Sequence, residues 1–324
     1  MGNNDVLIMD KSSPPDISLN ELDFHDTTFF GTPVSATTPP AKLPTPAAVR
    51  DEWQRQGRPY VVKFPQMNLV VKFGAPRKVR LEEAQTMRAI RQLFPQNEVP
   101  VPELFGWRVD QGQNFIYMSL VHGSVLLDTW ASLTQAEKLC IRDQLGGIVA
   151  ALRQIQQDPS DSFVGTSTTT LWLDAATKFG LGSINRGKVQ DIYFRDDQKA
   201  GPFADVKAFN DWVQFTALPH FPMSDRPSDP YRHFLTDTCA IYFSHGDLHL
   251  SNIIVSGPPG FRSIAAILDW EQAGWYPEYW EYCKALIGVP YDHEWRSDGW
   301  SETFMNPHEY ENTAVSEYWS WKQP

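Results

Sequence analysis

Residues 245–270 constrain the fold of this chain more than any other stretch, because they combine a polar loop with a predicted hairpin. The stretch begins H-G-D-L-H-L-S-N and ends I-L-D-W. Between these two groups, β-branched runs interrupted by Gly and Pro predict a loop, a strand, a tight connection and a second strand. Such a hairpin would bring Asp247, Asn252 and Asp269 together at one end.

These three side chains suit phosphoryl transfer. Asp247 would orient a hydroxyl group, while Asn252 and Asp269 would hold Mg²⁺ on the phosphates of a nucleotide. In an alternative interpretation, His245, Asp247 and His249 bind zinc or a pair of metal ions, because alternate residues of a strand share one face. That alternative leaves Asn252 and Asp269 without a role, and the sequence has no further His pair at ligand spacing. We therefore favour phosphoryl transfer.

The two linked motifs resemble those of the aminoglycoside phosphotransferase family, H-G-D-x-x-x-x-N followed by D about twenty residues later. Here Asn252 lies five residues after Asp247, and Asp269 lies 22 residues after it. The resemblance implies an α+β, two-lobed protein-kinase-like fold, with a small β-rich N-lobe and a larger, mainly helical C-lobe. It also implies ATP and Mg²⁺ as cofactors and a small-molecule hydroxyl group as acceptor. The D-F-G and A-P-E motifs of protein kinases are missing from the sequence.

The expected N-lobe covers residues 45–118. Thr45-Pro46 predicts a helix start, because Thr can cap and Pro is tolerated at the first helical position. Gly57 should stop this helix. Two strand-like runs follow and predict a hairpin, and residues 81–93 recur at helical spacing.

A lysine on a strand beside a glutamate on a helix can grip nucleotide phosphates, because the carboxylate holds the ammonium in place. The candidates are Lys72 and Glu83. The tetrapeptide V-V-K-F occurs twice, so Lys63 is an alternative to Lys72. We prefer Lys72 because its strand leads directly into the helix and matches the lysine strand of the family. Glu83 is preferred to Glu82 because it matches the Glu-Ala pair of the family.

The sequence departs from protein kinases before Lys72, where it has no G-x-G-x-x-G. We expect the connection at residues 65–68 to cover the phosphates instead. Residues 114–123 predict a strand that runs into a linker. By resemblance this linker is the hinge between the lobes, where backbone groups near Ser119 and Val121 would meet the adenine edge.

The expected C-lobe covers residues 119–324. Thr134 and Glu137 match a capping box at the start of a long core helix. The G-P-F…F-N-D segment within residues 201–211 also resembles a large fungal branch of the family whose substrates are mostly unassigned. Aromatic residues in 275–282 should begin a helix that packs against the catalytic loop. We expect residues 292–302 to form a solvated tail. In the alternative interpretation, the acidic and aromatic side chains of this segment, including Trp295 and Trp300, form a substrate wall that contacts the acceptor.

Composition narrows the class of protein and its surroundings. The net charge of −11 argues against nucleic-acid binding and against an anionic membrane surface. Residues 1–44 are polar and rich in Pro and Thr, which predicts a loosely held arm. Three widely spaced cysteines form no disulfide framework, and no signal peptide or membrane-spanning run is apparent, so we expect a cytoplasmic protein.

A catalytically silent kinase-like protein that binds a ligand or partner is the alternative from another class. The sequence does not identify the acceptor, choose between ATP and GTP, or fix the oligomeric state.

Overall fold

The structure is a computed structural model, and it describes seven stretches of the chain: residues 7–8, 42–57, 60–156, 182–183, 188–194, 200–218 and 228–322. Most of the predicted arm, residues 1–44, lies outside these described residues. Its described parts are β1 (Leu7–Ile8), which pairs in parallel with β7 (Ile155–Gln156), and residues 42–44.

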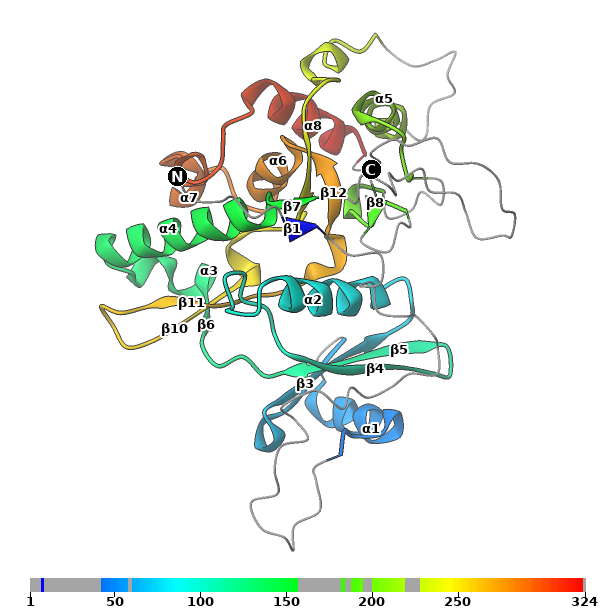
Figure 1. Cartoon of the computed structure of the whole chain (residues 1–324), viewed down its shortest axis with the longest axis vertical. Helices are drawn as coiled ribbons and strands as arrows, with labels where there is room; N and C mark the ends of the chain where they lie inside the picture. The colour runs from blue at the N-terminus through cyan, green and yellow to red at the C-terminus, as the bar shows by residue number, and fades with distance from the viewer. Residues whose placement is uncertain are drawn as a thin grey trace, which may run out of the picture.

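The N-terminal part is a four-stranded antiparallel sheet with one helix on each face (Figure 1). The strand order is β2-β3-β5-β4. Helix α1 begins as predicted, with Thr45 as its cap and Pro at the first position, and Gly57 ends it at a φ of 65°. The elements are α1 (Pro46–Gln56), β2 (Val61–Phe64), β3 (Leu69–Gly74), α2 (Leu81–Leu93), β4 (Leu104–Asp110) and β5 (Gln113–Ser119).

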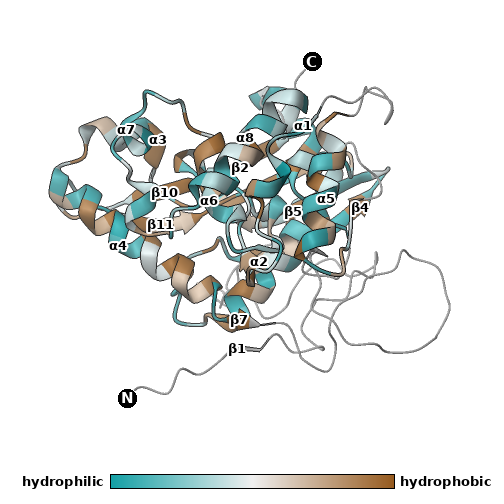
Figure 2. Cartoon of the chain, turned by 90° about the horizontal axis from the view of Figure 1, so that it is seen from above, coloured by the Kyte–Doolittle hydropathy of each residue, from teal (hydrophilic) through white to brown (hydrophobic). Residues whose placement is uncertain are grey.

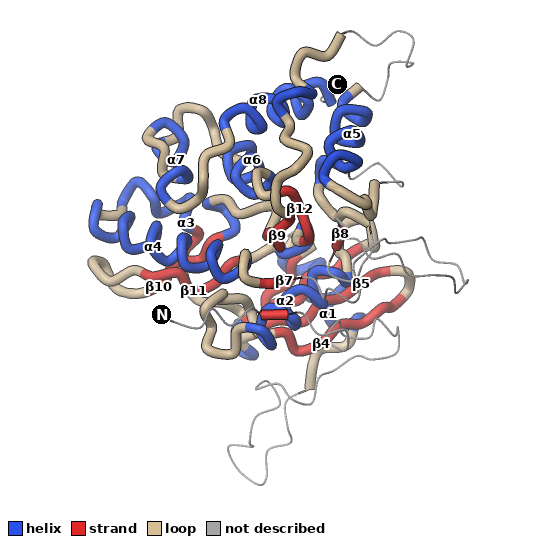
Figure 3. Tube along the Cα trace, turned by 45° about the horizontal axis from the view of Figure 1, so that its top comes forward, coloured by secondary structure: helices blue, strands red, loops and turns tan. Residues whose placement is uncertain are grey.

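The C-terminal part is mainly helical, as the blue and red segments of Figure 3 show. Its strands form a small sheet of β6, β10 and β11 and another of β8, β9 and β12. The strands are β6 (Ser124–Val125), β8 (Gly182–Ser183), β9 (Ile241–Ser244), β10 (Ile253–Ser256), β11 (Ser263–Ile267) and β12 (Gly274–Pro277). The helices are α3 (Leu126–Thr129), α4 (Gln135–Leu152), α5 (Val206–Ala217), α6 (Trp280–Ile287), α7 (Glu294–Ser297) and α8 (Glu309–Lys322).

Aromatic side chains fill the core of the C-terminal part. The predicted capping box starts α4, whose hydrophobic and hydrophilic residues alternate along the helix (Figure 2). Helix α6 begins at Trp280, within the aromatic stretch, whereas residues 275–277 of that stretch belong to β12 and not to a helix. Trp280 is completely buried. Trp295 and Trp300 are 1% and 7% exposed, so the expected solvated tail and the alternative of a substrate wall are both wrong for these two rings. They stack edge to face on Trp130 instead.

Hydrogen bonds to two backbone oxygens are among the contacts that join the lobes away from the linker. The Ile267 N–H donates to Pro100 O over 2.8 Å, so the second strand of the predicted hairpin lies against the end of the N-lobe. Arg80, which precedes α2, donates from Nη1 to Gln190 O over 2.8 Å. The expected α+β fold with a β-rich and a helix-rich lobe is confirmed, whereas the exact boundary at residues 118–119 stays a prediction. Among the described helices, none combines the length and the apolar character needed to cross a membrane.

Candidate active site

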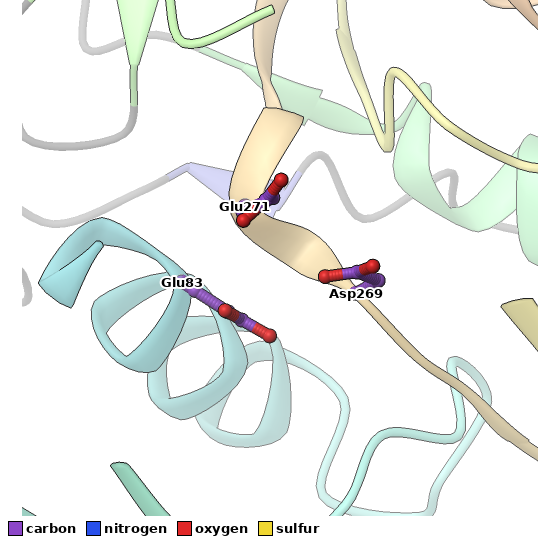
Figure 4. Close-up of side chains that lie close together, drawn as sticks. All are labelled: Glu83, Asp269 and Glu271. Carbon is purple, nitrogen blue, oxygen red and sulfur yellow. The ribbon is translucent and has the colours of Figure 1, made fainter. Parts of the chain in front are cut away.

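Four charged side chains meet where the two lobes face each other. Lys72 on β3 places Nζ 2.7 Å from Glu83 Oε2 on α2 and 2.5 Å from Asp269 Oδ1. Glu271 Oε2 is 3.6 Å from the same nitrogen. Figure 4 shows the carboxylates of Glu83 and Asp269 directed into one space between α2 and the turn that follows β11. The predicted lysine–glutamate pair therefore exists, and it extends directly to Asp269.

This cluster, Lys72 with Glu83, Asp269 and Glu271, carries more negative than positive charge. Burial alone would lower the pKa of Lys72, but the three carboxylates outweigh burial and raise it. Burial raises the pKa of Glu83 to about 7, although the ammonium opposes this shift. Carboxylate oxygens of the three acids lie within 4.8 Å of one another. Such a set of oxygen donors with excess negative charge fits Mg²⁺.

Glu271 is a site residue that sequence reasoning missed. The sequence pattern gives it no role, because it lies just before the aromatic stretch that we expect to pack the core. Its position two residues after Asp269 was the available signal, because a short turn can return both side chains to one side. A 3₁₀ turn over Trp270–Gln272 does so, and Asp269 precedes it with a φ of 66°.

Asp247 and Asn252 lie in contact on the loop between β9 and β10. Asn252 donates from Nδ2 to the Asp247 backbone oxygen over 3.0 Å and to Oδ2 over 2.9 Å. Both bonds use the amide nitrogen, so they orient the Asn252 carbonyl oxygen away from Asp247 and leave it as a possible metal ligand. Burial alone would raise the pKa of Asp247, but the His249 ring and the Lys284 ammonium outweigh burial and lower it to about 2. Asp247 is therefore an ionised hydrogen-bond acceptor at neutral pH.

His245 has a structural position rather than one that faces a ligand. Its ring is completely buried and stacks on Trp270. Nδ1 accepts from the Asp247 N–H over 3.2 Å, and Nε2 donates to Leu268 O over 2.9 Å. Burial lowers its pKa to about 4, so the ring is neutral near pH 7. These two bonds connect Asp247 to the residue before Asp269, which is how two separate motifs become one site.

Helix α6 holds the loop between β9 and β10 through a side-chain hydrogen bond. The Gly246 N–H donates to Glu281 Oε2 over 3.2 Å, and burial raises the pKa of Glu281 to about 7 despite backbone hydrogen bonds that oppose it. Gly246 has a φ of 75°, and a Cβ there would lie 2.7 Å from Gln272 O, so no larger residue fits. Glu281 is the second site residue that the sequence pattern did not reveal.

A cavity of about 240 Å³ lies between the lobes beside these groups. The preferred site residues that line it are Lys72, Glu83, Ser119, Val121, Asn252 and Asp269. Asp247 joins this group through its contact with Asn252. The rest of the lining is mostly apolar, with Val61, Val70, Met87, Pro102, Met118, Leu120, Ile254 and Leu268. Lys63 also lines the cavity, but it is exposed, and it is Lys72 that contacts Glu83.

The expectation that residues 65–68 cover the phosphates is wrong. The Leu120 N–H donates to Asn68 O over 2.7 Å, and His122 Nε2 lies 3.0 Å from Asn68 Oδ1. This turn is therefore attached to the linker between the lobes and lies away from Lys72. Antiparallel pairing is the reason, because it places the tip of the hairpin opposite the end of β5. The opposite end of β2, which follows Tyr60, lies beside Lys72.

Comparisons with known proteins give one family match and several structural neighbours. A family model described as "phosphotransferase enzyme family" matches residues 48–311. No match was found among curated proteins. The complex of APH(3'')-Id from Streptomyces rimosus with ADP and streptomycin is 12% identical, with a TM-score of 0.49 over 86% of this chain and 98% of that one. The GDP complex of aminoglycoside 2'-phosphotransferase-IIIa is 15% identical, with a TM-score of 0.45 over 82% and 80%. At these scores the neighbours add nothing to the family match.

Proposed function

Because the chain belongs to the phosphotransferase enzyme family, we propose that it transfers a phosphoryl group from ATP to a hydroxyl group of a small molecule. The observation that carries this proposal is the convergence of Lys72, Asn252 and Asp269 on one cavity, with Asp247 in contact with Asn252. Phosphoryl transfer depends mainly on positioning and on charge stabilisation, which these residue types supply.

Each residue has a distinct proposed role. Lys72, held by Glu83, binds the nucleotide phosphates. Asn252 and Asp269 hold Mg²⁺, which when bound would neutralise charge on the phosphates. Asp247 accepts the hydrogen of the acceptor hydroxyl and directs its oxygen at the phosphorus. The low pKa of Asp247 is compatible with this role, because orientation matters more here than proton affinity.

The apolar part of the cavity suits an adenine ring. We propose that the backbone groups of Ser119 and Val121 contact its polar edge. The Ser119 N–H donates to Glu103 O and the Leu120 N–H donates to Asn68 O, so neither of these two donors is offered to the base. We also propose a division into lobes at residues 45–118 and 119–324, and a cytoplasmic location. The three free cysteines are compatible with a reducing compartment.

Thermal unfolding with and without MgATP tests the nucleotide site. A ligand present at about 100 times its dissociation constant stabilises the native state by about 2.7 kcal/mol, which should raise Tm by about 5 °C. We expect Asp269→Asn to lose the metal-dependent part of this shift. Asp143→Asn, an exposed site on α4, is the matched control and should keep it in full.

Acceptor screening completes the test. ADP release is measured from MgATP in the presence of polyols, sugars and amino sugars. Acceptor-dependent release that Asp269→Asn abolishes would support the proposal. A wild-type protein without a thermal shift at millimolar nucleotide would contradict it, and a shift without any release would favour the silent binding protein.

A further inference from the structure

His249 lies two residues after Asp247, and one of its ring nitrogens is already engaged. Nδ1 accepts from the Ser251 N–H over 3.2 Å, which caps the 3₁₀ turn Leu250–Asn252. A nitrogen that accepts carries no hydrogen, so the hydrogen of the neutral ring is on Nε2. The loop backbone thus fixes both the orientation of the ring and the nitrogen that can donate.

The donor nitrogen faces Asp247. His249 Nε2 lies 3.5 Å from Asp247 Oδ1, whereas Asn252 holds Oδ2. The two carboxylate oxygens therefore have different neighbours on the same loop. The separation from Nε2 is long for a hydrogen bond, but contacts of this kind shorten in enzymes when the substrate arrives. Both side chains are partly accessible, at 17% for His249 and 19% for Asp247, as a reacting pair must be.

Gly288, at the end of α6, leaves room for the ring. A Cβ at Gly288 would lie 2.8 Å from His249 Cδ2. The backbone of Gly288 does not itself require glycine, because its φ is −78°. The need for a small residue comes from the ring, so helix α6 holds His249 from the side of Gly288.

We propose that His249 is a positioning residue for the transfer reaction, and this inference rests on the proposed function. Its Nε2–H fixes the rotation of the Asp247 carboxylate, so that a lone pair stays directed at the acceptor hydroxyl. Asn252 restrains one carboxylate oxygen and His249 restrains the other. The acceptor therefore meets a carboxylate that is already oriented, which is how a positioning group raises kcat.

Two substitutions of His249 separate its two nitrogens. Asn keeps an oxygen near the place of Nδ1 and can still cap the turn, but its short side chain cannot reach Asp247. Gln is longer and carries an amide N–H at about the reach of Nε2. We expect H249N to lower kcat about 10- to 100-fold, with KM for MgATP and Tm unchanged, and H249Q to recover most of the loss.

Two glycine variants on helices test the same contact without changing His249. G288A adds a methyl group against the ring and should lower kcat part of the way. G147A, on α4, is the matched control, because nothing lies within 4 Å of its Cβ, and it should leave kcat unchanged. The readout for all variants is ADP released from MgATP with water as the acceptor, together with Tm.

Three results would overturn the inference. One is equal loss of kcat in H249N and H249Q in step with a fall in Tm, which would leave only a structural role. Another is unchanged kcat in all the His249 and Gly288 variants. Wild-type protein that binds MgATP but releases no ADP with water or with any of the screened polyols, sugars and amino sugars would overturn the proposed function as well, so the failure of one proposal can be told from the failure of both.

Discussion

The loop of residues 247–252 and the charged cluster around Lys72 differ in how they are built. Asp247, His249 and Asn252 lie within six residues, and hydrogen bonds of the loop itself hold them. Lys72 and Asp269 are 197 residues apart and meet only because two lobes come together. The loop is a local structure, whereas the cluster depends on the whole fold.

The two regions also differ in charge balance. In the loop, Asn252 donates a hydrogen bond to one oxygen of the Asp247 carboxylate, and His249 Nε2 lies 3.5 Å from the other oxygen. In the cluster, one ammonium faces the carboxylates of Glu83, Asp269 and Glu271. The loop is therefore held by its own hydrogen bonds, whereas the cluster has an excess of negative charge that the proposed Mg²⁺ would offset. Chemistry and nucleotide binding should therefore fail separately when each region is altered.

Asp247→Asn should separate chemistry from binding most clearly. The amide keeps the size of the side chain but removes the negative charge that accepts the hydroxyl hydrogen. We expect kcat for ADP release to fall about 10³-fold, while the Tm increase caused by MgADP stays as in the wild type. A parallel loss of the MgADP effect would show that the two regions are not separable.

Lys72→Met should change the cluster in two directions. Removal of a charged hydrogen-bond donor to the phosphates should weaken MgADP binding about 10- to 100-fold. Without the ammonium, the three carboxylates should bind Mn²⁺ in the absence of nucleotide, which would appear as a new increase of Tm with metal. Lys63→Met is the matched control on β2, and it should show neither effect. If Lys63→Met weakened binding more than Lys72→Met, the two lysines would have to exchange roles.

A smaller effect concerns the free energy of unfolding, which should depend on pH because His245 is buried. Burial lowers the pKa of His245 to about 4 in the folded protein, against about 6.5 when unfolded. The unfolded chain thus binds more protons between these values, so the free energy of unfolding falls as pH is lowered. From about pH 7 to about pH 5 this loss should be about 2 kcal/mol.

Urea unfolding of the wild type and of His245→Asn at both pH values measures this term. The variant lacks the titrating ring and should lose less stability on acidification than the wild type. Glu281, whose pKa burial raises, contributes with the opposite sign in both proteins and cancels in the difference. Equal losses in the two proteins would mean that His245 is not the group responsible.

The parts of the site that the sequence predicted are those whose geometry is local. The spacing of Asp247, Asn252 and Asp269 across one hairpin is sufficient to bring them together. Lys72 and Glu83 follow from a strand that leads into a helix, with the family pattern to choose between neighbours. The two-lobed α+β fold follows from the same order of elements and the resemblance.

The parts that the sequence did not predict depend on register and on tertiary contacts. The pairing of β3 with β5 places the turn at 65–68 beside the linker. Nothing in the composition of the turn indicates this pairing, so the sequence could not exclude a position over the phosphates. Glu271 and Glu281 each lie among aromatic residues. The hydrophobic pattern there predicts that the segment is buried, but it does not show which polar group each carboxylate contacts. Trp295 and Trp300 show the converse, because rings in an acidic stretch turned out to be core.

The bonds of Arg80 to Gln190 and of Ile267 to Pro100 restrict how the lobes can move. The linker after β5 and the Lys72–Asp269 ion pair join the same two lobes at further points, so these contacts together oppose rotation about any single line. Arg80 directly precedes α2, which carries Glu83. Any change in the angle between the lobes would therefore act on the helix that carries Glu83, because the Arg80–Gln190 bond links the start of that helix to residues 188–194 of the C-lobe.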